Sequence, residues 1–416
     1  MLDFKWYVVF FAGFVSVSVS ALEQDWLINQ ELKEGVKEAS EAEGVSDEEV
    51  QSSKENVSEQ EALTSEVIYQ QMTRNAEAYR DAVRQHWATP IWSDVANWVT
   101  YNDDFSVRRW VDYQNNEIKI SFKVGGQPPS LTSQRVLVAG ELKELLLTTF
   151  HQALQREPLF DSLREVVSRV ANESWAEELV LGELYSSGGG SDELAALTRR
   201  LMSNAELRFS GDAQAGPAQL GVPLSESVTF FIPMPSNRLL RKAERLKPHI
   251  ALYAKQLSVP EDLIFSVIHT ESHFNPLARS KASAYGLMQV VPTSAGQDAT
   301  KFLFDEAVLL TPIDLFQPDK NIQIGTAYLS LLYSHYLRDI ENEASRWYCA
   351  VAAYNAGVSN VARAFVGAPQ FDLALGEVNR LSSDQVLQRL LSHLPADETR
   401  RYLKKVMARR AIYDKV

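Results

Sequence analysis

The chain has 416 residues, of which 45% are hydrophobic, and a formal net charge of −13. Its length and hydrophobic content can form a large core and predict two domains. The charge argues against a nucleic-acid partner, which needs a basic patch or stripe, and the single cysteine, Cys349, excludes a framework of disulfides within the chain.

The first predicted element is an export signal at residues 1–21. Lys5 precedes an apolar run from Trp6 to Val19, and Ser20 and Ala21 supply a small-residue cleavage pattern. The run suits a signal peptide and is short for a membrane span. Asp3 offsets the charge of Lys5, so an uncleaved segment that associates with the membrane is the alternative. Both alternatives place the chain in the periplasm or cell envelope.

Residues 22–66 predict a disordered acidic tether. Positions 23–66 hold fourteen Asp or Glu residues and three Lys, a net charge of −11, which leaves −2 for the rest of the chain. A segment this charged, with few large apolar residues, buries too little surface to offset the entropy lost on ordering.

Residues 67–235 predict an α+β domain. Helical patterns cover 68–87, 141–155 and 191–208, and strand patterns cover 105–114, 117–125 and 227–235. The first two strands flank a turn at residues 114–116. The domain shows no catalytic constellation, and its sequence leaves open substrate positioning, docking on the envelope, or binding of cell-wall synthesis or division proteins.

Residues 236–416 predict an all-helical domain, since helical periodicity dominates from Asn237 and no convincing strand follows. Pro233 and Pro235 break both patterns and mark the boundary. The expected fold class is therefore α+β, with a mixed α/β N-terminal domain followed by an all-helical domain.

One predicted helix carries a candidate catalytic acid in the stretch VIHTESHFNP, residues 267–276. Ser258 and Glu261 have the spacing of a capping box that begins the helix, and Asn275-Pro276 ends it near Phe274. At about 100° per residue, Glu271 lies roughly 20° from Ile264 and about 40° from Val267, within the apolar stripe. A carboxyl there loses solvation, which favours its neutral form and suits a general acid.

Two other interpretations of this helix are a metal site and a structural glutamate. His269 and His273 flank Glu271, but a zinc protease needs H-E-x-x-H, and here the order is H-T-E-S-H. Both histidines lie about 160° from Glu271 around the helix, so we expect them to face solvent rather than a metal. Alternatively, Glu271 is a buried glutamate that pairs with an arginine or caps a turn; the helix alone does not decide between this and catalysis.

Three further stretches bear on Glu271. AYGLMQVVPTSA, residues 284–295, presents Gln289 after a glycine, and its amide can both donate to and accept from a sugar. AVAAYNAG, residues 350–357, ends a buried helix at a glycine cap, with Tyr354 and Asn355 at the C-terminal end of the helix. HLPADETRRYLKKV, residues 393–406, begins another helix and carries Tyr402.

In this order, the four stretches resemble the lysozyme-like domain of lytic transglycosylases of the soluble type. The resemblance implies cleavage of the β-1,4 bond between N-acetylmuramic acid and N-acetylglucosamine in peptidoglycan, with a 1,6-anhydro end. It implies that Glu271 is the single catalytic acid and base. The substrate-binding residues that it implies are Ser280, Gln289, Tyr354, Asn355 and Tyr402.

The likeness extends upstream over roughly residues 70–416. IWSDVANWVTYNDDF, YQNNEIKISF and VTFFIPMPSN resemble the N-terminal domain of the membrane-bound lytic murein transglycosylase C family. That family carries a lipid-anchored cysteine at the end of its signal peptide. No cysteine lies near residue 21 here, so a lipid anchor is not carried over.

The resemblance implies peptidoglycan glycan strands as the partner, and neither a cofactor nor a metal. Most glycosidases use two carboxylates; nothing in the spacing of Asp298, Asp305, Glu306, Asp314 and Asp319 sets one of them opposite Glu271. The alternatives are a lysozyme-like hydrolase and a catalytically silent peptidoglycan-binding scaffold. A Cys349 nucleophile is disfavoured, because Cys349 lies in an apolar helix without a neighbouring histidine.

Overall fold

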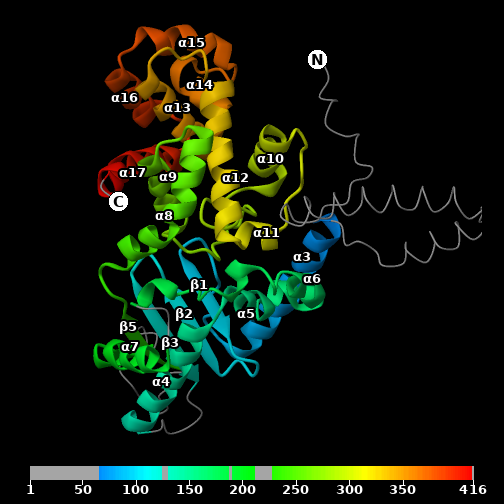
Figure 1. Ribbon diagram of the computed structural model, residues 1–416, viewed down its shortest axis with the longest axis vertical. Coiled ribbons are helices and arrows are strands. Elements are labelled where there is room, and N and C mark those ends of the chain that lie inside the picture. Colours follow the sequence, from blue (N-terminus) through cyan, green and yellow to red (C-terminus); the bar gives the residue numbers. More distant parts are fainter. Residues whose placement is uncertain (1–64, 124–129, 187–189, 211–226, 415–416) are drawn as a thin grey trace, which may run out of the picture.

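The computed structural model describes residues 65–123, 130–186, 190–210 and 227–414 (Figure 1). The predicted signal and all but the last two residues of the predicted tether lie outside these ranges. Within them, no helix is both long and apolar enough to cross a bilayer.

The N-terminal unit is a five-stranded antiparallel sheet with helices around it. The sheet order is β1-β2-β3-β5-β4. The strands are β1 (Asn97–Tyr101), β2 (Val107–Asp112), β3 (Glu117–Lys123), β4 (Glu206–Ser210) and β5 (Ser227–Pro233). The helices are α3 (Ser65–His86), α4 (Leu131–Leu147), α5 (Phe150–Gln155), α6 (Arg164–Arg169) and α7 (Ser191–Ser203), with 3-10 turns at Pro158–Leu163, Ser174–Glu177 and Gly182–Leu184.

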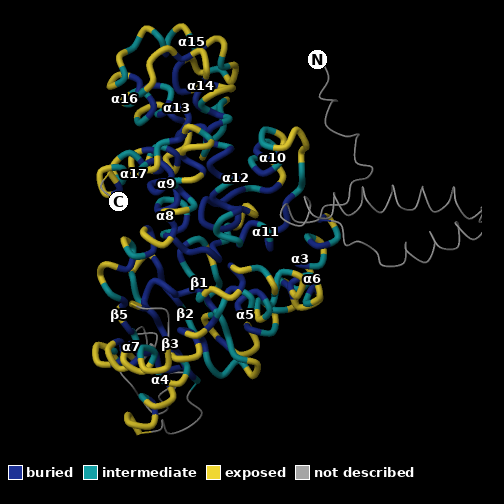
Figure 2. The backbone as a smooth tube through the Cα atoms, viewed as in Figure 1, coloured by how far each residue is buried: buried dark blue, intermediate teal, exposed yellow. Residues whose placement is uncertain are grey.

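The central strands β3 and β5 form the core of this unit. Ile118 pairs with Ile232, and Ile120 pairs with Phe230, and all four side chains are fully buried. Their alternation along each strand sends every second side chain to the same face of the sheet. Figure 2 shows this buried sheet at the centre of the lower unit, with exposed residues mainly on the outer helices.

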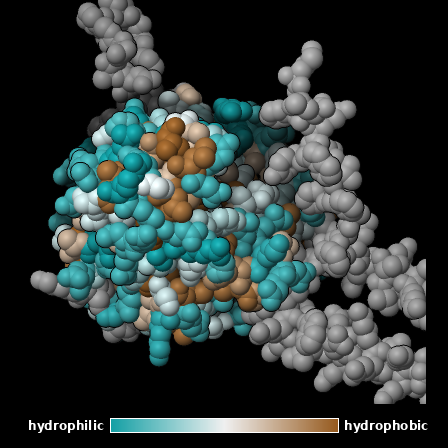
Figure 3. All heavy atoms as spheres, turned by 90° about the horizontal axis from the view of Figure 1, so that it is seen from above, coloured by the Kyte–Doolittle hydropathy of each residue, from teal (hydrophilic) through white to brown (hydrophobic). Residues whose placement is uncertain are grey.

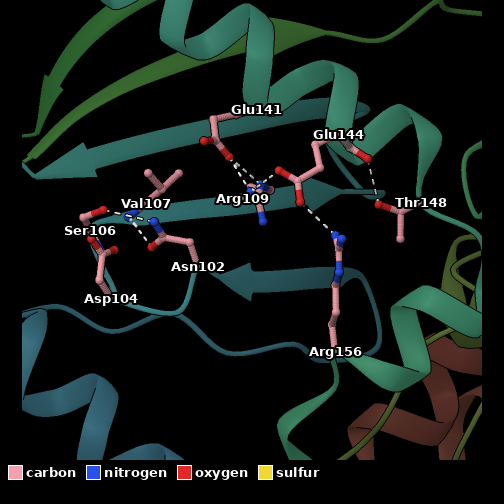
Figure 4. Close-up of polar contacts among 9 residues, drawn as sticks. All are labelled: Asn102, Asp104, Ser106, Val107, Arg109, Glu141, Glu144, Thr148 and Arg156. Atoms are coloured by element: carbon pink, nitrogen blue, oxygen red, sulfur yellow. Dashed lines mark hydrogen bonds and ion pairs between the residues drawn. The ribbon is translucent and has the colours of Figure 1, made fainter.

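Helix α4 is fixed to the sheet by a charged cluster (Figure 4). The Arg109 guanidinium on β2 donates to Glu141 at 2.7 Å and to Glu144 at 2.8 Å, both on α4. Glu144 also accepts from Arg156, which follows α5, at 2.8 Å. The cluster therefore joins strand β2 to helix α4 and to the end of the neighbouring helix α5.

The regular secondary structure of the described C-terminal unit is helical, and isolated bridges join Tyr285 to Arg279 and Val290 within the loop after α9. Its first helices are α8 (Arg238–Leu257), α9 (Glu261–Ser272), α10 (Gln297–Phe304), α11 (Pro312–Phe316) and α12 (Pro318–Leu331). The later ones are α13 (Glu343–Ala356), α14 (Val358–Val366), α15 (Phe371–Arg380), α16 (Ser383–His393) and α17 (Asp397–Tyr413), and π-helical turns cover Pro292–Gly296 and Leu332–Tyr336.

The far end of this unit carries α14, α15 and α16 and is seen end-on in Figure 3. Apolar side chains form patches there within a mainly hydrophilic surface. Val366 on α14 and Leu373 on α15 are exposed large hydrophobic residues of this end. Single exposed apolar residues are normal on a soluble surface and need no special role.

The expected fold class, a mixed N-terminal unit followed by a helical one, is confirmed, whereas three local predictions are corrected and one strand was missed. Ser258 does not cap α9: it ends α8 in the left-handed region, with φ 54°, and α9 begins after Pro260. The helix expected over 141–155 is broken, because Thr149 caps α5 in a capping box with Gln152. The helix expected over 191–208 ends at Ser203 and is followed by β4. Strand β1 was not predicted.

The two units are joined by a buried charge network. Arg238, at the start of α8, lies 3.3 Å from Glu183, and the Lys242 ammonium lies 3.2 Å from the same carboxylate. Arg238 also donates to the Asn116 side chain at 2.8 Å, on the turn before β3. Glu183 and Arg238 have no exposed side-chain surface. This network sets how the helical unit sits on the sheet.

A second set of contacts joins the units near the chain segment before β1. The Arg279 guanidinium lies 2.9 Å from the Glu157 carboxylate. The backbone N–H of Arg279 and the side chain of Asn275 both donate to the carbonyl of Asp94 at 3.4 Å. Arg279 directly precedes Ser280, so the N-terminal unit supports a loop that the sequence analysis marked as functional.

Candidate active site

A cleft of about 570 Å³ lies where the end of α9, the loop after it, the end of α13 and the start of α17 meet. All six predicted site residues line it: Glu271, Ser280, Gln289, Tyr354, Asn355 and Tyr402. The other lining residues are Val95, Thr270, Ala282, Ala284, Val291, Glu398, Arg401 and Lys405. Four segments far apart in sequence therefore meet in one cavity.

Glu271 lies in the last turn of α9, which ends at Ser272 because His273 adopts the left-handed region at φ 52°. Desolvation is the main cause that raises the pKa of the Glu271 carboxyl to about 8. The nearby charge of Glu398 also raises this pKa, whereas the Tyr402 hydroxyl lowers it. Within the described part of the chain Glu271 has no ion pair, so the alternative of a glutamate paired with an arginine is not supported.

Tyr402 faces Glu271 from α17. Its hydroxyl is buried, and among the described residues no group makes a hydrogen bond of good geometry with it. Burial, followed by the charge of Glu271, raises the pKa of the Tyr402 hydroxyl well above its ordinary value, so it stays protonated. The Tyr402 hydroxyl acts on the Glu271 carboxyl, whose pKa it lowers, and it can also donate to a ligand oxygen that enters the cleft.

Ser280 and Gln289 frame the loop that follows α9. The Ser280 hydroxyl oxygen accepts from the backbone N–H groups of Ala282 and Ala284, each at 3.1 Å, which leaves its own hydrogen to donate. Gln289 adopts a left-handed backbone at φ 48°, and its amide nitrogen donates to the carbonyl of Gly286 at 2.9 Å. Its Oε1 is buried without a partner in the described structure, so it can accept from a sugar hydroxyl or amide.

Asn321, fully buried on α12, holds this loop in place. Its amide nitrogen donates to the carbonyls of Tyr285 and Leu315, each at 2.8 Å, and its oxygen accepts from the backbone of Met288 at 2.7 Å. Gly286 has φ +76°, and an added Cβ would lie 2.1 Å from the Leu315 carbonyl oxygen. The glycine of the G-L-M-Q motif is therefore required by this close approach.

Tyr354 and Asn355 end α13, which Gly357 terminates at φ +80°. The Tyr354 hydroxyl donates to the Met288 carbonyl at 2.8 Å, so it is already engaged with the loop of Gln289. Its ring packs against Tyr328 with 5.5 Å between centroids. Asn355 is exposed at the rim of the cleft, where its amide can bind a ligand.

The expectation that both histidines face solvent is wrong. His269 is only 8% exposed and shares a 2.9 Å hydrogen bond with the Tyr413 hydroxyl, and His273 is half-buried. Burial, aided by the charge of Arg409, lowers the pKa of His269 to about 3 and that of His273 to about 4. The reason is that α17 packs across this side of α9, a contact that the helix's own sequence does not reveal.

Three charged residues of the cleft were missed by the sequence analysis: Glu398, Arg401 and Lys405. All lie on α17 within one turn of Tyr402, so the helical spacing around Tyr402 could have identified them. Val95 was also missed. It comes from the N-terminal unit, and only the tertiary contact of that unit with Asn275 and Arg279 brings it to the cleft.

Glu398 is the second carboxylate of the cleft, and none of the five acidic residues named beforehand lines it. Asp314 pairs with Lys320 at 2.7 Å, and Asp319 lies 2.6 Å from His249. Cys349 is fully buried, and burial raises the pKa of its thiol far above the ordinary value. A thiolate nucleophile is therefore not supported.

Comparison with protein families gives a match of residues 249–372 to the Transglycosylase SLT domain. A protein of Pectobacterium atrosepticum, named membrane-bound lytic murein transglycosylase C, is 39% identical over 313 residues, which cover 74% of this chain and 80% of that protein. A protein of the same name from Histophilus somni is 40% identical over 178 residues, 42% of this chain and 48% of that protein.

Among solved structures, a lytic transglycosylase Slt of Pseudomonas aeruginosa in an inactive mutant form matches at 29% identity. The match covers 41% of this chain and 24% of that one, with a TM-score of 0.32. The 70 kDa soluble lytic transglycosylase of Escherichia coli matches at 20% identity over 86% of this chain and 43% of that one, also with a TM-score of 0.32. With TM-scores this low, neither likeness supports an argument about this chain.

Proposed function

The chain belongs to the family of membrane-bound lytic murein transglycosylases C, enzymes that cleave glycosidic bonds as lyases, and from this membership we propose a single-carboxylate mechanism on peptidoglycan. The bond cleaved is the β-1,4 bond between N-acetylmuramic acid and N-acetylglucosamine, and the new end is a 1,6-anhydromuramoyl group. Glu271 acts as both acid and base. The observation that carries the proposal is the raised pKa of Glu271 in a cleft where Gln289 Oε1 has no hydrogen-bond partner among the described residues.

In the first step, the neutral Glu271 carboxyl donates its proton to the glycosidic oxygen, and the bond from that oxygen to C1 of the muramic acid breaks. A pKa of about 8 keeps the proton on Glu271 at neutral pH. A carboxyl with its ordinary pKa would have lost this proton. Desolvation in the cleft is thus what allows this glutamate to serve as the acid.

In the second step, the oxygen of the C6 hydroxyl of the same sugar attacks C1, and its proton passes to the Glu271 carboxylate. Glu271 returns to its starting state, and no water is consumed. The nucleophile belongs to the sugar that reacts, so holding that sugar oriented removes much of the entropic cost, on the order of 7–11 kcal/mol in favourable cases. A second carboxylate is not needed for this chemistry.

The remaining site residues bind and orient the glycan. Gln289 Oε1 accepts from a sugar hydroxyl or acetamido N–H, and the Ser280 and Tyr402 hydroxyls donate to sugar oxygens. Tyr354 and Asn355 line the same cleft from the end of α13. Because these dipoles are fixed before substrate arrives, they can stabilise the positive charge that develops at the ring without reorganising.

The domain organisation follows the same proposal. Residues 236–416 form the catalytic domain, and residues 67–235 form a domain that supports the loop before Ser280. Residues 1–21 direct export, and residues 22–66 serve as a tether, so the enzyme acts on the cell wall in the periplasm. Peptidoglycan glycan strands are the substrate.

The test is the mass of the products released from purified sacculi. Intramolecular attack by the C6 hydroxyl adds nothing to the mass of the substrate, whereas hydrolysis adds one water for each bond cleaved. We expect anhydro-muropeptides. Reducing ends alone would identify a hydrolase, and binding to sacculi without any released product would identify a silent scaffold.

A further inference from the structure

Two cationic side chains in the wall of the catalytic cleft, Arg401 and Lys405, have no ion-pair partner among the residues that the structure describes. Among the lining residues, the charged ones are Glu271, Glu398, Arg401 and Lys405. Arg401 and Lys405 are one helical turn apart on α17, so their side chains lie on neighbouring parts of one helix surface. Both are exposed.

The other arginines of α17 have evident structural roles. Arg400 contacts the carbonyl of Leu394 and pairs with Asp397, Arg409 donates to Thr270 at 2.9 Å, and Arg410 pairs with Asp262. Arg401 and Lys405 make no such contact with any residue that the structure describes. Their charges are therefore available to a ligand.

The positive charges on α17 affect the pKa of a residue close to Glu271. After burial, the charges of Arg409 and Lys405 are the next causes that lower the pKa of His273, two residues beyond Glu271. His273 is consequently neutral at pH 7. Among the described residues, the one carboxylate that lines the cleft besides Glu271 is Glu398, and it forms no ion pair with either cation.

The neutral sugars of a glycan strand do not need the two cations Arg401 and Lys405 for binding, whereas charged peptides attached to the strand can pair with them. Each peptide is attached to the lactyl group of a muramic acid, the sugar whose C1 bond is broken, so it must leave the cleft across a rim close to Glu271. Such peptides carry free carboxylates. Arginine and lysine bind carboxylates through charge-assisted hydrogen bonds.

Resting on the proposed function, we propose that Arg401 and Lys405 bind the carboxylates of the peptide attached to the muramic acid at the cleaved bond. The pair makes the enzyme favour glycan strands that carry charged peptides. A lactyl carboxylate, which is freed when a peptide is removed, offers the same chemistry from a second source, and the test separates the two.

The test uses three soluble, uncrosslinked glycan substrates: strands with native peptides, strands whose peptide carboxylates have been converted to amides, and strands stripped of peptides by an amidase. The variants are Arg401→Gln, Lys405→Gln and the double variant. The control is Lys404→Gln, which removes the same charge from an exposed neighbour on α17 outside the cleft lining. Thermal unfolding checks that all variants remain folded.

For the double variant on native strands, we expect KM to rise about three- to tenfold with kcat unchanged, the size expected for two exposed ion pairs. The wild-type enzyme should show the same rise when the peptides are amidated, and the double variant should show no further rise. Lys404→Gln should match the wild type. At about 1 M salt, where screening is nearly complete, the preference of the wild type should disappear.

Equal kinetics of the double variant and the wild type on native strands would overturn the inference and leave the proposed function intact. A loss confined to stripped strands would assign the pair to the lactyl carboxylate instead and would also overturn it. If the wild type released no product from any of the three substrates, the proposed function itself would fail.

Discussion

The Tyr354 hydroxyl donates a 2.8 Å hydrogen bond to the carbonyl of Met288, the residue before Gln289. This bond joins the end of α13 to the loop that follows α9. It places an aromatic ring and a side-chain amide on adjoining walls of the cleft. The two motifs that carry these residues are more than sixty positions apart in sequence, and the hydrogen bond explains why both are needed at one site.

Replacement of Tyr354 by phenylalanine should remove this bond and keep the ring. We expect the free energy of unfolding to fall by about 0.5–1.5 kcal/mol, since one intramolecular hydrogen bond is lost. Turnover should fall roughly ten- to a hundredfold, because small displacements of a positioning group are costly. Urea denaturation and product release measure the two effects. Tyr336→Phe, at an exposed tyrosine, is the control; equal behaviour of the two variants would argue against the bond's role.

Replacement of Tyr402 by phenylalanine should change the pH profile. The Tyr402 hydroxyl lowers the pKa of Glu271, so its loss should raise that pKa. In the wild type, kcat/KM should be flat below about pH 8 and fall above it as Glu271 loses its proton. In Tyr402→Phe this alkaline limb should move to higher pH. A shift of the limb to lower pH would contradict the assigned contact.

The ionisation of Glu271 should also appear in stability. Its pKa in the folded chain, about 8, lies above its ordinary value of 4.5, so between these values the folded state holds a proton that the unfolded chain releases. The stability that this group contributes is complete below pH 4.5 and is lost as pH rises through 8. Glutamine cannot ionise. The melting temperature of Glu271→Gln should therefore rise relative to the wild type between pH 5 and pH 8.5, and a constant difference would count against a raised pKa.

The buried network between the two units predicts a large loss of stability. Burial opposes ionisation of Glu183, but the charges of Lys242 and Arg238 lower the pKa of its carboxyl overall. Glu183→Ala leaves both cations buried without their carboxylate. It should lower the free energy of unfolding by about 3–5 kcal/mol. Glu244→Ala, on the exposed side of α8, should cost little. Urea denaturation compares them, and equal losses would show that the network does not hold the units together.

Much of the fold was predictable from local patterns. The alternation of Ile118 and Ile120 predicted β3, and helical periodicity predicted that the C-terminal unit is helical. Errors arose where two signals compete over a few residues. Ser258 has the spacing of a helix cap but ends the preceding helix, and Thr149 interrupts a pattern that is apolar on both sides of the break.

The candidate site also contains features that local patterns predict and features that only tertiary packing determines. The six residues predicted from the sequence line one cleft. Their motifs could be recognised because each forms a local structure, such as a helix end or a glycine turn, that positions its own side chains. Features that depend on tertiary packing could not be predicted from the sequence. The burial of His269 depends on Tyr413, and the presence of Val95 in the cleft depends on the contact of the N-terminal unit with Asn275.

The account depends on Glu271 as the one group that gives and then takes back a proton. The most direct measurement is the rate at which Glu271→Gln releases anhydro-muropeptides from sacculi, compared with the wild type at pH 7. We predict a loss of at least about 10²–10⁴-fold, the usual contribution of a general acid–base, with binding to glycan retained. Release within tenfold of the wild-type rate would contradict the central claim.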